Sequence, residues 1–295
     1  MTRSTPARAD DADLSEVSKE KPIDAPGRCP SMPFETIATS DYAARTRRRT
    51  RRQALAFPVL DKEPGRLGRR LATLPGAGHP VLAYICGILL SFAVIAGLSI
   101  VAGLLVTRAL LHVHGVAADD ERLIGFFARH RSSGLTDASL VGSIMAGGVV
   151  LPIIAGVAAL VALLGKHWRL AGFLLFALAV ESGSYRATTL LVHRDRPEVH
   201  RLENLPVDAS YPSGHTAAAI AVYCGIALLL TSRIASRGTR AAIWAVAALI
   251  PVFVAFSRMY RGMHHPLDVA GGVLIGIAAL SALVLVTRAA GRAAR

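Results

Sequence analysis

The sequence predicts an all-α protein, a six-span transmembrane helical bundle preceded by a disordered N-terminal tail. The 295 residues are 53% hydrophobic and only 18% charged, whereas about a quarter of the residues in a typical soluble domain are charged. The apolar residues form long runs that are nearly free of charges. The polar residues gather in the first 79 positions and in short segments between the runs. This distribution excludes a simple soluble enzyme.

Residues 1–79 are rich in Pro, Ser, Thr and charged residues and show little hydrophobic periodicity. Such a segment cannot bury enough apolar surface to offset its ordering entropy, so we expect it to be disordered. Its basic run RTRRRTRR at 45–52 is interpreted as solvated charge that keeps the tail cytoplasmic, with contact to anionic lipid headgroups as the alternative. We therefore divide the chain into a tail, 1–79, and a membrane domain, 80–295.

Six apolar segments of 17–28 residues follow the tail. A bilayer core of about 30 Å needs roughly 20 residues of helix, with a range of about 17–25, so each segment can cross it. Only helices satisfy their own backbone in lipid at this length. Pro152 and Pro251 fall inside spans and are expected to kink them. The expected spans are 81–107, 138–165, 170–192, 213–232, 241–257 and 269–287.

The net charge of +13 fits either a nucleic-acid partner or basic cytoplasmic loops. Much of the positive excess beyond the tail lies in acid-free segments at 166–169, 233–240 and 288–295, which is the pattern of membrane topology. These segments and the tail are therefore expected in the cytoplasm, and 108–137, 193–212 and 258–268 outside. We expect a multi-pass plasma-membrane protein with membrane lipids as its surroundings and no nucleic-acid partner. Its oligomeric state is not indicated.

Three outward stretches carry the residues suited to chemistry. The first two are HRDRP at 193–197 and YPSGHT at 211–216. Clustered Arg194 and Arg196 match the geometry of a phosphate, with surface charge near headgroups as the alternative. Ser213 and Gly214 open a span, where unpaired N–H groups and the helix dipole favour an anion. His215 follows within a turn, and an ordinary capped helix is the alternative there.

The third stretch is SRMYRGMHHPLD at 257–268. If it is helical, His264 and Asp268 lie on one face, and the carboxylate can hold one imidazole N–H. The other ring nitrogen is then available as a nucleophile or base. A loop salt bridge is the alternative. His265 is expected to point elsewhere and to have no role. The acidic run 119–121 is expected in a solvated loop, with cation binding as the alternative.

Together the three stretches resemble the signatures of the type-2 phosphatidic acid phosphatase superfamily, the integral-membrane lipid phosphate phosphatases. Those signatures are Lys, six residues, Arg-Pro; then Pro-Ser-Gly-His; then Ser-Arg, five residues, His, three residues, Asp. The sequence carries Arg196-Pro197, Pro212-Ser213-Gly214-His215, and Ser257-Arg258 with His264 and Asp268. The resemblance covers about 80–295 and includes the six-span architecture.

The resemblance implies a metal-independent phosphoric monoester or diphosphate hydrolase that acts on lipid phosphates and needs no cofactor. It implies that His264 attacks phosphorus, that Asp268 orients it, and that His215 protonates the leaving oxygen. Arg196, Arg258 and the Ser213–Gly214 helix end would neutralise the phosphate oxygens. The sequence contains no HExxH or cysteine-rich metal-binding motif.

One position departs from the signatures, because Thr189 stands where they have lysine. We expect altered phosphate binding there, with Arg186 either replacing the lysine or supporting packing. The outward site suits a substrate whose tail lies in the bilayer, such as a polyprenyl pyrophosphate or a phosphatidate. A lipid-linked phosphotransferase and a non-enzymatic protein of the same fold remain alternatives. A vanadium haloperoxidase has similar signatures, but six spans disfavour that interpretation.

Overall fold

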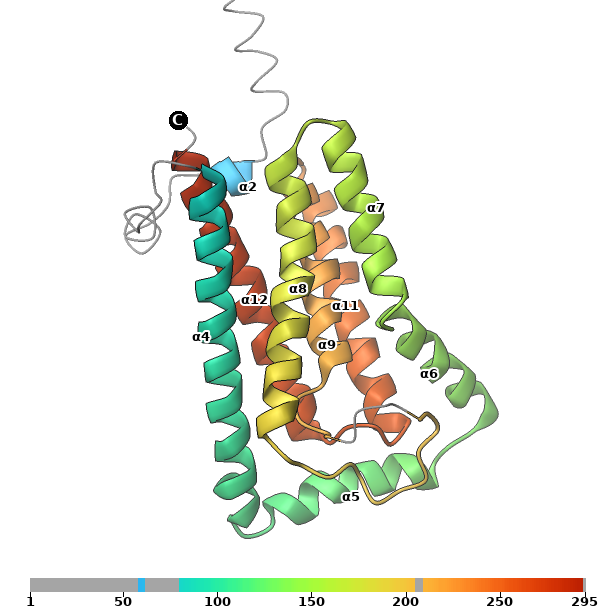
Figure 1. The fold of residues 1–295 in the computed structure, drawn as a ribbon. Coiled ribbons are helices and arrows are strands. Elements are labelled where there is room, and N and C mark those ends of the chain that lie inside the picture. The colour runs from blue at the N-terminus through green and yellow to red at the C-terminus, as the bar shows by residue number, and fades with distance from the viewer. Residues whose placement is uncertain (1–57, 62–79, 205–208, 294–295) are drawn as a thin grey trace, which may run out of the picture. The chain divides into compact units, whose positions relative to one another are not determined.

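A computed structural model describes residues 58–61, 80–204 and 209–293, and every regular element among them is helical (Figure 1). The expected all-helical fold is confirmed for this part of the chain. The long helices are α4 (Pro80–Arg108), α8 (Trp168–Leu191), α11 (Arg237–Tyr260) and α12 (Pro266–Ala293). Proline stands at the first position of α4 and of α12, where its missing N–H leaves no hydrogen bond unmade.

The segment expected as one span at 138–165 is two helices, α6 (Ser133–Met145) and α7 (Val150–Leu164), bent by 43°. A kink was expected at Pro152, but the bend lies between Met145 and Val150, toward the N-terminus from it. Gly147 and Gly148 lie in the connection, and glycine is a poor helix former. Pro152 falls in the first turn of α7, where proline is tolerated. In contrast, α11 continues through Pro251 to Tyr260.

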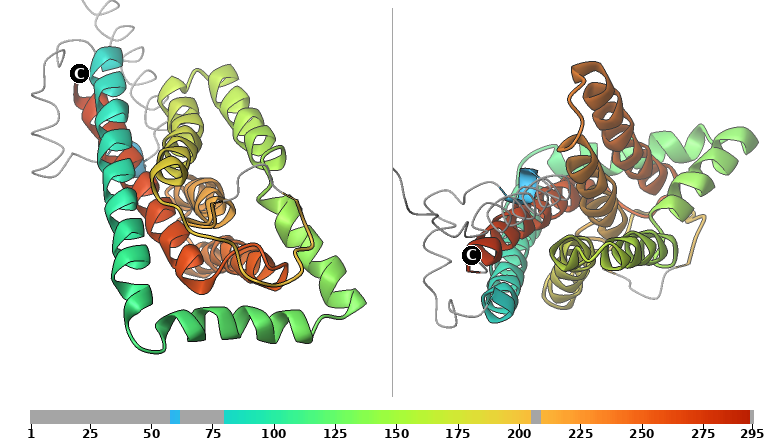
Figure 2. Two further views of the ribbon diagram at one scale, coloured as in Figure 1. Left: turned by 60° about the horizontal axis from the view of Figure 1, so that its bottom comes forward. Right: turned by 90° about the horizontal axis from the view of Figure 1, so that it is seen from above.

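The span expected at 213–232 consists of α9 (Gly214–Ala219), one π-helical turn η2 (Ile220–Cys224) and α10 (Gly225–Thr231). Two helices were not expected. The first is α5 (Val116–Arg129), which follows the 3-10 turn η1 (Leu110–His112) and lies across the end of the bundle between α4 and α6 (Figures 1 and 2). The second is the single turn α2 (Pro58–Asp61).

The core lies where α4, α8, α12 and the α9–α10 segment pack together. Phe173, Ala217 and Leu283 are fully buried there. Leu60 of α2 is buried in the same cluster, so the expectation of disorder is wrong for residues 58–61. The rest of the tail, including the basic run at 45–52, lies outside the described residues.

Large apolar side chains cover the outside of the helices, for example Leu98 at 62% exposure and Leu164 at 77%. A soluble monomer rarely exposes apolar surface on this scale. Four of the described helical segments are long and apolar enough to cross a membrane, or five if the bent pair α6–α7 forms one span. The molecule is therefore a multi-pass membrane protein by its helices. The segment α8 is not among these candidates, because Glu181 and Arg186 interrupt its apolar run.

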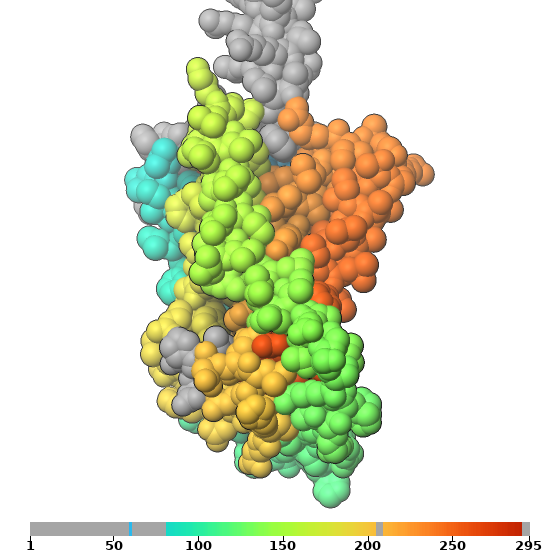
Figure 3. All heavy atoms as spheres, turned by 90° about the vertical axis from the view of Figure 1, so that its right-hand side faces the viewer, coloured from blue at the N-terminus to red at the C-terminus, as the bar shows by residue number. Residues whose placement is uncertain are grey.

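The loop between α8 and α9 lies at the same end of the bundle as α5. In the space-filling view, it lies beside α6, and α6 and α7 run along the same face (Figure 3). The α7–α8 connection and the end of α12 lie at the opposite end (Figure 1). The motif-bearing stretches therefore occupy one end of the bundle, which we call the site end.

Candidate active site

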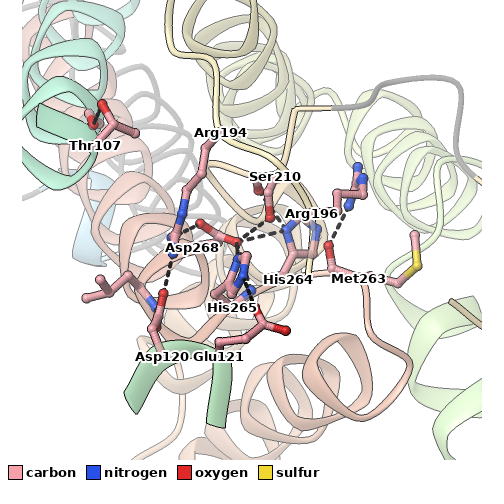
Figure 4. Close-up of polar contacts among 12 residues, drawn as sticks. Thr107, Asp120, Glu121, Arg194, Arg196, Ser210, Met263, His264, His265 and Asp268 are labelled. Atoms are coloured by element: carbon pink, nitrogen blue, oxygen red, sulfur yellow. Dashed lines mark hydrogen bonds and ion pairs between the residues drawn. The ribbon is translucent and has the colours of Figure 1, made fainter. Parts of the chain in front are cut away.

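The three sequence stretches meet at the site end. Arg194 contacts Asp268, which lies 74 residues further along the chain (Figure 4), and the backbone N–H of Ser213 donates to the carbonyl of Asp268. The α8–α9 loop supplies Arg194, Arg196 and Ser210. The turn between α11 and α12 supplies His264 and His265. Gly262 in this turn has a φ of 73°, a left-handed conformation that glycine adopts without strain. This glycine ends the helical path of α11 and directs the chain toward His264.

His264 is buried, and its Nδ1 lies 2.7 Å from the carbonyl oxygen of Ser210. Because a carbonyl only accepts hydrogen bonds, Nδ1 carries the proton and Nε2 is the basic nitrogen. The expected direct hydrogen bond to Asp268 does not form, since Nδ1 lies 3.9 Å from Oδ2. Burial lowers the pKa of His264 well below its usual value, opposed by Asp268 and reinforced by Arg258 and Arg196. The ring is thus neutral and suited to nucleophilic attack.

The four-residue spacing of His264 and Asp268 does not place them on one helix face, because α12 begins only at Pro266. The residue before a proline is disfavoured in the helical region, so His264 does not share a helix face with Asp268. Asp268 is instead the third helical residue, and its Oδ2 accepts from the backbone N–H of His265 at 2.8 Å. This is the carboxylate half of a capping box.

The remaining partners of Asp268 are side chains. Its carboxylate accepts from Arg194 Nη1 and from the Ser210 hydroxyl, and His265 Nδ1 lies 3.2 Å from Oδ2. Ser210 therefore joins Asp268 to the carbonyl that holds His264. His265, expected to have no role, contacts the carboxylate that His264 was expected to contact.

Arg194 differs from the expected phosphate ligand. Both of its terminal nitrogens donate to buried carboxylates, Nη1 to Asp268 and Nη2 to Asp120 of α5. The expectation of a solvated loop at 119–121 is also wrong, because these residues belong to α5. Asp120 is buried, and its Oδ1 also accepts from the backbone N–H of Leu267 at 3.1 Å. Arg194 and Asp120 thus hold the start of α12 against α5.

Arg258 is fully buried near the end of α11. Its Nη1 donates to the Ser143 hydroxyl of α6 and, at 2.7 Å, to Glu203 Oε2. Its Nε and Nη2 are buried and find no hydrogen-bond partner within the described residues. A buried guanidinium with unmade hydrogen bonds is costly, and it is the arrangement that an anion would complete.

Glu203 in the α8–α9 loop also accepts from Arg261 Nε. Burial alone would raise the pKa of Glu203, but the charge of Arg258, hydrogen bonds from Ser143 and Arg258, and Arg261 together lower it to about 2. Glu203 is therefore an anion at neutral pH and balances two neighbouring arginines.

His215 lies in the first turn of α9, close enough to Arg258, Glu203 and Arg196 to be influenced by their charges. Arg196 is buried, and its Nη1 donates to the carbonyl of Met263 at 2.5 Å. His264 in turn is influenced by Arg258, Arg196 and His215. The charges of Arg258 and Arg196 thus act on both expected catalytic histidines, and we call these four residues the histidine–arginine cluster.

The start of α9 is held against α12. The backbone N–H of Ser213 donates to the carbonyl of Asp268 at 2.9 Å, and the Ser213 hydroxyl lies 3.0 Å from that of Thr216. A Cβ added to Gly214 would lie 3.1 Å from the ring of Tyr185 on α8. The expected Ser213–Gly214 element is thus fixed beside the cluster, and Tyr185 packs on it.

Thr189, which stands where the signatures have lysine, lies one helical turn beyond Tyr185 in α8. Thr189 is buried, and its hydroxyl donates to the carbonyl of Arg186 at 3.0 Å. The side chain of Arg186 is exposed, so these residues face different surroundings despite their three-residue spacing. Arg186 nevertheless lies near enough to Tyr185 for its charge to act on the phenol.

Sequence reasoning missed Ser210, Glu203, Ser143, Tyr185 and His265. Glu203 could have been suspected as an acid in a loop rich in arginine, but no local pattern distinguishes the other four. No three histidine, cysteine or acidic side chains in the described ranges gather as metal ligands would.

The fold and the site define a helical membrane protein whose chemical groups meet at one end of the bundle. A crystal structure of a transmembrane PAP2-type phosphatidylglycerolphosphate phosphatase from Bacillus subtilis has a similar fold. The TM-score is 0.54 at 23% identity, over 69% of this chain and 93% of that one. Residues 170–292, which contain all three signatures, match the PAP2 superfamily model. The expected resemblance to this superfamily is confirmed over residues 170–292.

The chain is also similar in sequence to two relatives. The chain is 43% identical over 76 residues to the undecaprenyl-diphosphatase of Sulfolobus acidocaldarius, which is 25% of this chain and 32% of that protein. It is 27% identical over 176 residues to phosphatidylglycerophosphatase B of Bacillus subtilis, which is 59% of this chain and 85% of that protein. The chain thus spans about a third of the first relative and most of the second.

Proposed function

We propose that this protein is a phosphatase that releases phosphate from a lipid phosphate or diphosphate through a phosphohistidine intermediate. The observation that carries the proposal is the buried Arg258, whose Nε and Nη2 have no partner among the described residues, beside the neutral His264. The names of the relatives, an undecaprenyl-diphosphatase and a phosphatidylglycerophosphatase, support a phosphorylated membrane lipid as the substrate class.

In the first step, Nε2 of His264 attacks phosphorus while the bond to the leaving oxygen breaks. Arg258, Arg196 and the N–H groups at the start of α9 neutralise the other phosphate oxygens. Such charge stabilisation by fixed donors is the main contribution to phosphoryl transfer. A bound phosphate brings negative charge beside His215 and favours its protonated form, so His215 can give its proton to the leaving oxygen.

In the second step, water attacks phosphorus and loses a proton to His215, while the phosphorus–nitrogen bond breaks. Inorganic phosphate leaves, and both histidines return to their starting states. The arginines supply the positive charge of this mechanism, which requires no metal ion. Ser210 and Asp268 keep the Nδ1 proton of His264 in place throughout.

We also propose that α8 is a membrane span, which with α6–α7 counted as one gives six. The charged and small polar residues of α8 include Glu181 and Ser184, which are buried, and polar groups within a membrane usually face the bundle interior. The basic segments then face the cytoplasm of a cell whose plasma membrane holds the protein. The site end faces outward, where a lipid presents its phosphate to water.

The test is phosphate release by purified protein from a panel of lipid phosphates and diphosphates, with EDTA present. We expect release with EDTA and a loss of at least about 10³-fold in His264→Ala, as removal of a nucleophile typically costs. His215→Ala should lose roughly 10²- to 10⁴-fold, and less with a good leaving group. His200→Ala is the matched control, because this exposed histidine lies in the α8–α9 loop.

Folded His264→Ala protein that keeps near-normal turnover would overturn the assignment of the nucleophile. Radiolabelled phosphate that appears on a second lipid rather than in water would instead identify a phosphotransferase. A requirement for added metal would contradict the role given to the arginines.

A further inference from the structure

His265 lies between two carboxylates that belong to different helices (Figure 4). Its Nδ1 is 3.2 Å from Asp268 Oδ2 of α12, and its Nε2 is 2.9 Å from Glu121 Oε2 of α5. The ring is buried, whereas the Glu121 side chain is 38% exposed. Each ring nitrogen therefore has its own acidic partner.

The two contacts require a particular protonation state. An ionised carboxylate only accepts hydrogen bonds, so both ring nitrogens must carry protons to make both bonds. Neutral histidine can make only one of them. Burial lowers the pKa of His265, but the hydrogen bond and charge of Asp268, with a smaller contribution from Glu121, outweigh burial and the opposing charge of Arg194, so its pKa is raised.

The surrounding charges favour the same state. Asp268, Glu121 and Asp120 bring three carboxylates to the region, and Arg194 is the positive group that contacts two of them. His264, a further titratable neighbour, is neutral. A protonated His265 therefore reduces the excess of negative charge around Asp268.

The bridge also joins α5 to the catalytic groups. Asp120 reaches Asp268 through Arg194, and the adjacent Glu121 reaches it through His265, so neighbouring residues of one helix hold the carboxylate through two cations. Asp268 in turn accepts from the Ser210 hydroxyl, and the Ser210 carbonyl holds His264.

We propose that His265 is a positioning residue, a doubly hydrogen-bonded imidazolium that ties Glu121 to Asp268 and thereby fixes the orientation of His264. This inference rests on the proposed function of the site. Loss of its proton breaks one of the two bonds, so the bridge holds below the pKa of His265 and is lost as the pH rises through it. The alkaline limit of turnover then depends on Glu121.

The protonation state is tested first, by ¹⁵N correlation spectra of the histidine rings in full-length protein, with His265→Asn to assign the signals. We expect both nitrogens of His265 to be protonated at pH 6 and the transition to occur above the usual histidine range. Glu121→Gln should lower the pH of that transition. A ring with one protonated nitrogen at pH 6 would overturn the proposal.

The consequence for the site is tested with Glu121→Gln against Asp119→Asn. Both variants remove one carboxylate from α5, but Asp119 pairs with Arg122 at the exposed surface. We expect the alkaline limb of kcat to move to lower pH in Glu121→Gln and to stay in place in Asp119→Asn. If the two variants show the same dependence of kcat on pH, the positioning role of His265 is overturned.

Substitutions of His265 itself separate positioning from packing. His265→Phe keeps the ring volume and loses both bonds, so kcat should fall roughly ten- to hundredfold, as the loss of hydrogen bonds to charged groups implies. His265→Asn can still donate to Asp268, so it should recover part of that loss and lack the alkaline transition. Equal kcat values in His265→Phe and the wild type would contradict the proposal.

The experiments distinguish a failure of the proposed phosphatase function from a failure of the role proposed for His265. If the wild type releases no phosphate from any lipid, the ring spectra still decide the protonation of His265. Binding of orthovanadate, a phosphate analogue that needs no turnover, then reports on positioning. We expect weaker binding in Glu121→Gln and unchanged binding in Asp119→Asn, and equal binding in both would overturn the inference.

Discussion

Asp268 and His264 are four residues apart, yet the structure joins them through a third residue. Ser210 donates its hydroxyl to Asp268 and accepts from His264 through its carbonyl. The carboxylate consequently influences the imidazole through the position of Ser210 as well as through its charge. At the scale of single residues, the path of the backbone decides which groups a catalytic side chain contacts. Here α12 begins only at Pro266, so His264 lies before the helix that carries Asp268.

Glu203 provides a prediction at the same scale. Its carboxylate accepts from the buried Arg258 and Arg261, so Glu203→Gln leaves two like charges without their counterion. We expect the free energy of unfolding to fall by about 1–2 kcal/mol at pH 7, less than for a fully buried pair because the side chain is 19% exposed. The measurement is chemical or thermal unfolding in detergent.

The pH dependence of this contribution has a defined sign. The pKa of Glu203 is lowered from 4.5 to about 2 in the folded protein. Its stabilising contribution is therefore complete above about pH 4.5 and is lost as the pH falls toward 2. Glu203→Gln should remove this part of the acid sensitivity. Glu198→Gln, an exposed acid in the same loop, is the control, and an equal effect in both would contradict the role of the arginine pair.

At the scale of elements, the site depends on how closely α12 approaches the start of α9. A Cβ added to Gly272 would lie 2.4 Å from the carbonyl oxygen of Ser213, and one added to Gly276 would lie 2.7 Å from that of Ala217. These distances are shorter than van der Waals contact, and both obstacles are backbone atoms. Glycine at these positions therefore allows α12 to hold the Ser213–Gly214 element beside His264.

Gly272→Ala should accordingly disturb both packing and chemistry. We expect a loss of about 1–3 kcal/mol in the free energy of unfolding, as overpacking typically costs, together with a lower kcat because Ser213 must move. Gly97→Ala is the matched control, since a Cβ at this position in α4 would meet nothing within 4 Å. That change should be neutral or stabilise the helix by up to about 1 kcal/mol. Equal Tm and kcat values in the two variants would refute the close-approach argument.

The connection through α5 is also an element-scale feature. This helix was not expected, because residues 116–129 include the acidic run 119–121 and lack a long apolar stretch. It is amphipathic, with Ile124 buried and Arg122 exposed. Its acidic residues become part of the site only through tertiary contacts with His265 and Arg194, and local sequence patterns do not reveal such contacts.

At the scale of the molecule, long apolar runs predicted the helices well. Four expected spans correspond to helical segments that are long and apolar enough to cross a membrane, because this property depends on composition alone. The signatures predicted which residues would meet at one end. Composition could not predict the break at Gly147–Gly148 or the partners of Asp268, since those depend on backbone geometry and on residues distant in sequence.

The whole molecule also provides a prediction about orientation. The site residues gather at one end of the bundle, while the α7–α8 connection, with Lys166, and the end of α12, with Arg288, lie at the other. Lys and Arg in short loops favour the cytoplasmic side. We therefore expect the site end to face outward, where the phosphate of an outer-leaflet lipid would reach it from the membrane surface.

Cysteine labelling of the full chain tests this orientation. In a background with Cys29, Cys86 and Cys224 replaced, His200→Cys marks the α8–α9 loop and Arg237→Cys marks the start of α11, and both positions are exposed. A membrane-impermeant maleimide should label His200→Cys in intact cells and Arg237→Cys only after permeabilisation. Each position serves as the control for the other, because both become accessible in lysed cells. The reverse pattern would place His264 at the cytoplasmic face, and the substrate would then have to be a lipid phosphate of the inner leaflet.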